Sequence, residues 1–152
     1  MNRNGCVEIE DFKVACQCGA VRFSVAAGPA FQSVCHCRMC QRATGNAFAP
    51  LIEVDNDRIA FDGYAKTFRS SNLAERGFCD ECGTPLFYRR IDSDTTEFMV
   101  GAVDTDIRYA PVANHGVESR AGWVLELAGV AEKETFFTQG EQPVSHQFEH
   151  GD

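Results

Sequence analysis

Seven of the eight cysteines fall into three short clusters, a spacing that is typical of metal ligands. The clusters are Cys16-Gln17-Cys18, Cys35-His36-Cys37-Arg38-Met39-Cys40 and Cys79-Asp80-Glu81-Cys82, and a glycine follows closely after each of them. Thiolates two or three residues apart can point at one ion only if the backbone turns tightly, and glycine relieves the strain of such a turn. The clusters therefore predict metal binding through thiolates, with zinc as the expected ion.

The grouping of these cysteines into four and three predicts two zinc sites of different kinds. A closed structural zinc takes four protein ligands, whereas a catalytic zinc keeps three protein ligands and one open position. The structural site is expected to use the two outer pairs, Cys16, Cys18, Cys79 and Cys82. The catalytic site is expected to use the middle cluster, Cys35, Cys37 and Cys40. We therefore expect two zinc ions per chain.

Three other interpretations of the cysteines stay open at this point. A disulfide framework is disfavoured because neighbouring Cys-x-Cys residues do not bridge to each other easily and the chain has the character of a cytoplasmic protein. Thiolates also suit iron or an iron–sulfur cluster. The second zinc site is purely structural if His36 or another side chain completes it. Cys6, which lies outside the clusters, receives no role.

Composition and charge narrow the class of protein. The chain has 152 residues, of which 44% are hydrophobic, and a net charge of −8. An acidic protein is poorly suited to nonspecific nucleic-acid binding, which depends on lysine and arginine neutralising phosphates. The first ten residues lack the apolar segment of a secretory signal, and no apolar run approaches the roughly 20 residues that span a bilayer. We expect a cytoplasmic protein that binds neither nucleic acid nor membrane.

The elements that would position the cysteines are mostly β-strands. Val21, Phe23 and Val25 alternate with polar neighbours, which places the apolar set on one face of a strand. Further β-branched or aromatic runs predict strands at residues 48–54, 58–61, 65–69, 86–89, 98–103 and 123–130. One short helix is expected at residues 38–43, beside the middle cluster. The fold class is therefore all-β, with loops organised by metal.

Three segments are expected along the chain. Residues 1–11 are interpreted as a loose N-terminal lead-in, and residues 12–137 as one zinc-binding domain. Residues 138–152 are polar and rich in turn formers, so we expect a mobile tail.

The cysteine motifs resemble one known family. Cys16-Gln17-Cys18-Gly19, the segment from Cys35 to Gly45, and Phe78-Cys79-Asp80-Glu81-Cys82-Gly83-Thr84-Pro85-Leu86 resemble the glutathione-dependent formaldehyde-activating enzymes, a family that also includes centromere protein V. Residues 115–123 resemble the C-terminal signature of the family. This sequence departs from the family at Gly116, Val117 and Gly122, where larger aromatic residues or proline are common.

The resemblance implies a fold, a set of ligands and a reaction. The fold is a pair of tent-like antiparallel sheets around two zinc sites, with the two outer cysteine pairs on the structural zinc and the middle cluster on the catalytic zinc. The reaction joins formaldehyde to glutathione and gives S-(hydroxymethyl)glutathione, which is carbon–sulfur lyase chemistry in the synthetic direction. The implied partners are a small glutathione-like thiol and an aldehyde. The alternative is a non-catalytic zinc module that binds a thiol or a protein partner.

The chemistry of a thiolate-rich zinc agrees with a thiol substrate. A soft thiol should compete well for the open position and bind as a thiolate, the nucleophile that attacks an aldehyde carbon. An equal possibility is that zinc polarises the carbonyl oxygen. Arg38 and Arg42 lie four residues apart and could meet the carboxylates of the ligand. His115 is expected to orient a ligand or a turn, and Trp123 to fill the core.

Overall fold

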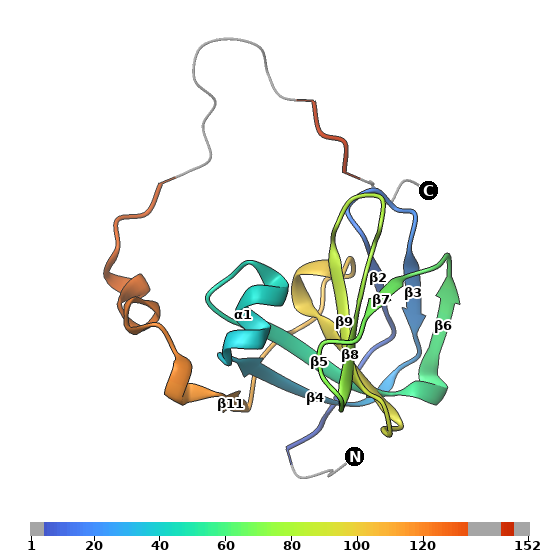
Figure 1. Cartoon of the computed structure of the whole chain (residues 1–152), viewed down its shortest axis with the longest axis horizontal. Coiled ribbons are helices and arrows are strands. Elements are labelled where there is room, and N and C mark those ends of the chain that lie inside the picture. Colours follow the sequence, from blue (N-terminus) through green and yellow to red (C-terminus); the bar gives the residue numbers. More distant parts are fainter. Residues whose placement is uncertain (1–4, 134–143, 148–152) are drawn as a thin grey trace.

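Two β-sheets of unequal size form the body of the protein (Figure 1). The computed structural model describes residues 5–133 and 144–147. The strands of the larger sheet are β1 (Val7–Ile9), β4 (Gly28–Cys35), β5 (Ala49–Asp55), β7 (Lys66–Phe68), β8 (Ala74–Phe78), β9 (Pro85–Arg90), β10 (Thr95–Met99) and β11 (Ala113–His115). Their order is β1-β4-β5-β10-β9-β8-β7, and β11 also pairs with β4. The smaller sheet has the order β2-β3-β6, with bounds Phe12–Ala15, Arg22–Val25 and Ile59–Asp62.

The pairings confirm the expected all-β class. Neighbouring strands of both sheets run antiparallel, apart from the parallel pair of β11 and β4. The expected helix near the middle cysteine cluster is also confirmed as α1 (Arg38–Thr44). The remaining helical segments are 3-10 turns, η1 (Asn56–Arg58), η2 (Val100–Ala102), η3 (Val117–Ser119) and η4 (Gly122–Gly129). No helix within residues 5–133 and 144–147 has the length and apolarity needed to cross a bilayer.

The core lies between the inner faces of the two sheets. As the alternation predicts, Phe23 and Val25 of β3 are buried, whereas Arg22 and Ser24 between and beside them are exposed. The ring of Phe23 packs against Phe98 of β10, with 5.2 Å between ring centroids, and against Phe87 of β9 at 6.0 Å. These aromatic contacts bury a large apolar area and hold the small sheet on the large one.

Of the six further runs expected as strands, four form as expected, one ends early and one does not form a strand. Those at residues 48–54, 58–61, 65–69 and 86–89 are confirmed as β5, β6, β7 and β9. The run at 98–103 is strand only as far as Met99, after which η2 turns the chain.

The prediction of a buried strand at residues 123–130 is wrong. This segment forms η4, which lies apart from both sheets in Figure 1 (orange), and Trp123 is 54% exposed instead of filling the core. Its backbone bonds are local, since Val124 N donates to Ala121 O and Val130 N to Leu127 O. An apolar run becomes a strand only where a neighbour supplies hydrogen-bond partners, and no strand among the described residues pairs with this segment.

The structure describes part of each of the two expected terminal segments, residues 1–11 and 138–152. Within the expected lead-in, Val7–Ile9 form β1 and pair with β4, so this part of the chain adds an edge strand to the large sheet. Most of the expected tail at 138–152 lies outside the described residues, which include only 144–147 of it.

Candidate metal centres and the adjoining cavity

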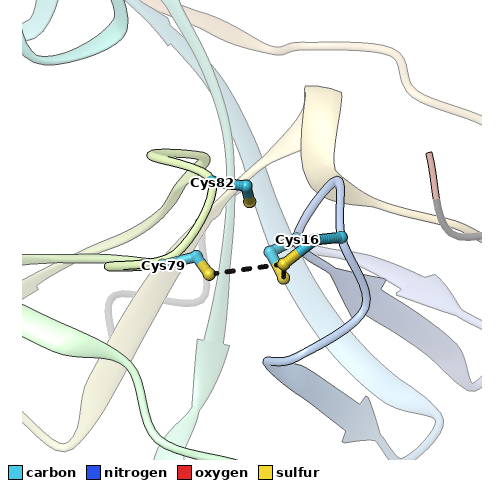
Figure 2. A group of neighbouring side chains, drawn as sticks. Cys16, Cys79 and Cys82 are labelled. Atoms are coloured by element: carbon cyan, nitrogen blue, oxygen red, sulfur yellow. Dashed lines mark hydrogen bonds between the residues drawn. The ribbon is translucent and has the colours of Figure 1, made fainter. Parts of the chain in front are cut away.

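Four cysteines from two loops meet where the sheets adjoin. Cys16 and Cys18 lie in the loop between β2 and β3, and Cys79 and Cys82 in the loop between β8 and β9. Their sulfur atoms all lie within 4.8 Å of one another. Figure 2 shows Cys16, Cys79 and Cys82 turned toward one point. The four-cysteine cluster therefore joins a loop of the small sheet to a loop of the large sheet.

The distances in this cluster suit a thiolate-bound zinc. Cys16 Sγ lies 3.5 Å from Cys18 Sγ, which lies 3.8 Å from Cys79 Sγ. Tetrahedral zinc with bonds of about 2.3 Å separates its sulfur ligands by about 3.8 Å, whereas a disulfide brings them to about 2.05 Å. The backbone is already turned for this purpose, because Gly83 N donates to Cys79 O at 2.9 Å with φ of 77° at Gly83. The donor set and its geometry fit zinc.

Three further cysteines converge at the junction of β4 and α1. Cys35 ends β4, Cys37 is the N-cap of α1, and Cys40 lies in the first turn of that helix. Their sulfur atoms lie within 4.8 Å of one another, and within the described chain no other His, Cys, Asp or Glu joins this group. The Cys40 amide donates to Cys37 Sγ at 3.4 Å. The middle cluster thus offers three ligands that converge on one point, as its sequence predicts.

The segment after β11 holds this cluster in place from the side. The amide of His36 donates to the His115 carbonyl at 2.8 Å. Gly116, with φ of 62°, packs so closely that an added Cβ would lie 2.7 Å from Cys37 N. The side-chain Nε2 of Gln41 donates to His36 O at 2.7 Å and to Ser119 O at 2.9 Å. These bonds fix the backbone that carries Cys35, Cys37 and Cys40.

A cavity of about 380 Å³ opens beside the three-cysteine cluster. Its floor is one face of the large sheet, where the strand register aligns a row of cross-strand neighbours. From β4 to β8 the row runs Phe31, Glu53, Glu97, Tyr88, Arg76. The cavity is also lined by the three cysteines, by Met39 and by the exposed His115, which pairs with Cys35 in the large sheet. The cavity therefore brings charged and apolar side chains to the cysteines.

Arg76 is the buried cation of this site. It is 8% exposed, its Nη2 donates to Cys40 Sγ at 3.3 Å, and its guanidinium lies 5.0 Å from the centre of the Tyr88 ring. Within the described chain its Nε and Nη1 have no hydrogen-bond partner. A hydrogen bond from Cys35 and the nearby Arg76 lower the pKa of Cys40 to about 5, although burial opposes them. The hydrogen bond to Cys40 and burial raise the pKa of Cys35, so the negative charge in this cluster is stabilised on the Cys40 sulfur.

Glu97 is the mostly enclosed carboxyl group of the same cavity. Burial raises its pKa to about 7, the facing carboxylate of Glu53 and the sulfur of Cys40 add to the rise, and Arg76 opposes it. In the part of the chain that the structure describes, no hydrogen bond or ion pair engages the Glu97 carboxyl. This group changes its charge near neutral pH within reach of the cavity.

The other site residues expected from the sequence lie in different places. His115 lines the cavity. Arg38 donates to Gln41 Oε1, and Arg42 lines a separate hollow beside Phe68, so neither arginine lines the cavity at the three cysteines. His36 is buried and its Nε2 lies 3.1 Å from Asn114 Oδ1, away from the group of converging ligands.

Sequence reasoning missed Arg76 and Glu97. The available signal was charge inside two short strands, Glu75 and Arg76 within residues 74–78 and Glu97 within residues 95–99, because a charged side chain is seldom buried unless it is paired.

Comparison with known proteins identifies one family. The glutathione-dependent formaldehyde-activating enzyme family matches residues 11–119 of the chain. A protein of Halomonas elongata, provisionally named after the same enzyme, is 28% identical over 123 residues, which cover 72% of this chain and 77% of the relative. An uncharacterised lyase of Schizosaccharomyces pombe is 26% identical over 89 residues, covering 59% of this chain and 65% of the relative. The matched segment contains both cysteine clusters and the strands that form the cavity floor.

Proposed function

The chain belongs to the family of glutathione-dependent formaldehyde-activating enzymes, and from this premise we propose that it joins a thiol to an aldehyde at the three-cysteine cluster. The thiol is glutathione or a close relative, the aldehyde is formaldehyde, and the product is S-(hydroxymethyl)glutathione, so the enzyme is a zinc-dependent carbon–sulfur lyase acting in the synthetic direction. One observation carries the proposal: three sulfur atoms converge at the wall of a cavity of about 380 Å³.

Two zinc ions per chain are part of this proposal. Cys16, Cys18, Cys79 and Cys82 would hold the structural ion, and Cys35, Cys37 and Cys40 the ion at the cavity. Zinc held by three thiolates supplies a soft open position at which a substrate thiol binds as thiolate. The convergence of the sulfur atoms and their spacing support this assignment.

The residues of the cavity would bind and orient the thiol. Arg76 holds Cys40 through its Nη2 donor and fixes the position of the cluster. Arg90, on the same strand as Tyr88, lines the cavity and offers its cation to a carboxylate of the tripeptide. His115, which pairs with Cys35 at the edge of the large sheet, also lines the cavity and would contact the ligand. Since Arg38 is engaged by Gln41 and Arg42 lines another hollow, we assign the carboxylate contact to Arg90.

A second candidate is a non-catalytic zinc module that binds a protein partner. It is favoured by the exposed apolar side chains of η4, where Trp123 is 54% and Leu125 67% exposed. Such side chains gathered on one segment are typical of surfaces that contact other proteins. In this case the cavity would bind a thiol without turning it over.

Metal content and turnover together test the proposal. Purified protein should contain two zinc ions per chain and accelerate the exchange between glutathione, formaldehyde and their adduct, as measured by NMR exchange spectroscopy. Cys37→Ala should lose one zinc and the acceleration, whereas Cys6→Ala, outside both clusters, should keep both ions and full activity. Thiol binding without any acceleration over the spontaneous reaction would favour the second candidate and refute the enzyme.

A further inference from the structure

Joining a thiol to an aldehyde forms one carbon–sulfur bond and transfers one proton from the sulfur to the carbonyl oxygen. The sulfur must lose its proton before it attacks, and the carbonyl oxygen must gain one after the carbon–sulfur bond has formed. A side chain that accepts and then returns this proton must line the cavity and change its charge near the working pH. The three cysteines are occupied as ligands under the proposed function, so another group is required.

Glu97 occupies the position that such a group needs. It stands at the centre of the row on the cavity floor, with Glu53 beside it on β5 and Tyr88 beside it on β9. It lines the same cavity as Cys35, Cys37 and Cys40. No hydrogen bond or ion pair within the described residues holds its carboxyl, which leaves the oxygen atoms to a ligand.

We propose that Glu97 is the proton-transfer residue of this site. Its carboxylate takes the proton from the substrate thiol, and the resulting thiolate forms the carbon–sulfur bond with the aldehyde carbon while the carbonyl π pair moves to oxygen. The carboxylic acid then gives the same proton to that oxygen. Thiol and aldehyde become the hydroxymethyl thioether, and Glu97 returns to its starting state with no other reactant consumed. This inference rests on the proposed function.

The surroundings of Glu97 suit both halves of this transfer. Burial, the Glu53 carboxylate on β5 and the Cys40 sulfur on α1 raise its pKa to about 7, while Arg76 on β8 acts in the opposite direction. The facing Tyr88 on β9 has a raised pKa, chiefly through burial, and so stays protonated and uncharged. An acid whose pKa lies near neutrality is a good base and a good acid in turn.

The other titratable side chains near the cavity are less well placed. His36 is buried and its Nε2 lies 3.1 Å from Asn114 Oδ1, outside the residues that line the cavity. Arg76 and Arg90 are guanidinium groups, which keep their protons at all physiological pH values. The exposed His115 and Glu53 also line the cavity and can accept a proton. Glu97 differs from both in its place at the centre of the row, between Glu53 and Tyr88.

Activity as a function of pH is the first test. The kcat/KM of the zinc-loaded wild type should fall below about pH 7 as Glu97 becomes protonated. Glu97→Gln, which mimics the neutral acid in size, should lower kcat by about 100-fold or more and remove this limb. Glu97→Asp keeps a carboxylate and should recover part of the rate. Glu8→Gln, on the exposed face of β1, is the matched control and should leave the rate and the profile unchanged.

Proton release on thiol binding is the second test and needs no turnover. Calorimetry of glutathione binding at pH 8 in two buffers of different ionisation enthalpy counts the protons released to solvent. A thiolate bound beside Glu97 adds negative charge and raises the pKa of the carboxyl further, so that Glu97 keeps the proton at pH 8. Wild type should therefore release well below one proton, whereas Glu97→Gln should release about one. Zinc content of each variant, measured on the same samples, shows that the site is intact.

The outcomes separate the two proposals. Equal proton release and equal rates in wild type and Glu97→Gln would overturn the role of Glu97 and leave the enzyme assignment standing. A wild type that neither binds glutathione nor accelerates the reaction would overturn both. A Glu97→Gln variant that has lost its zinc, with Glu97→Asp showing no recovery of rate, would make Glu97 a structural residue and refute the proton-transfer role.

Discussion

Replacing Gly116 by alanine should dislodge the three-cysteine cluster while sparing the four-cysteine cluster. Gly116 has φ of 62°, and an added Cβ would lie 2.7 Å from Cys37 N and 2.9 Å from Cys37 Cβ. Both atoms belong to the N-cap of α1, which a side-chain rotation cannot move out of the way. The backbone that carries Cys37 must shift, and the convergence of the three sulfur atoms is lost.

The size of the effect follows from two contributions. The left-handed conformation costs a residue with a Cβ roughly 1–2 kcal/mol. At roughly 2–4 °C for each kcal/mol in a protein of this size, the melting temperature should fall by about 2–8 °C. The clash between the added Cβ and Cys37 lowers the stability further if the backbone stays in place. If the backbone of Cys37 moves away to relieve the clash, the effect is weaker metal binding at the three-cysteine cluster.

The assay combines elemental analysis with thermal unfolding. Gly116→Ala should retain about one zinc per chain and still unfold cooperatively. The matched control is Gly122→Ala, where an added Cβ meets nothing within 4 Å, and it should keep two zinc ions and the wild-type melting temperature. A Gly116→Ala protein with two tightly held ions and wild-type stability would show that this segment does not hold Cys37 in solution.

Three further predictions concern the metal clusters, Glu97 and Trp123. Cys79→Ala should unfold or aggregate the protein because it opens the cluster that joins the two sheets, whereas Cys37→Ala should lose one zinc and stay folded; equal melting curves for the two variants would contradict this. Glu97→Gln should be more stable than wild type at pH 9, by up to about 3 kcal/mol, with the difference narrowing toward pH 5. The sign follows because the pKa of Glu97 is raised to about 7 on folding, so its contribution to stability is present at low pH and is lost as the pH rises through 7; denaturant titrations at the two pH values measure it. Trp123, the single tryptophan, should emit like an exposed indole and be quenched readily by acrylamide, and a blue-shifted, protected emission would show that η4 is covered.

The cysteine groups could be predicted from sequence because their chemistry is local. A thiolate two or three residues from another reaches the same ion whatever the rest of the fold does, so spacing and number alone pointed to groups of four and three. The short helix followed from the same segment, where Cys37 caps the helix and Cys40 lies in its first turn. Alternation on β3 was equally local, and Phe23 and Val25 are buried as predicted.

The cavity floor could not be predicted because it depends on strand register. Arg76, Tyr88, Glu97 and Glu53 come from four strands, and they become neighbours only through the pairings of β8, β9, β10 and β5. Arg38 and Arg42 were favoured instead because they lie close to the cysteines in sequence. The prediction of a strand at residues 123–130 is wrong for a related reason. Apolar periodicity indicates a face that could be buried, but it does not indicate whether another strand is there to cover it.

The two cysteine clusters differ in how they are embedded, and this difference explains why one can remain open. Cys18 and Cys79 are 61 positions apart and belong to loops of different sheets, so a metal between them closes a long loop and ties the sheets together. Cys35, Cys37 and Cys40 lie in one continuous segment already fixed by β4, α1 and the hydrogen bonds to β11 and Ser119. Closing the longer loop removes roughly 2 kcal/mol more chain entropy from the unfolded state. The fold therefore depends little on the middle cluster, which leaves its fourth position free for a substrate.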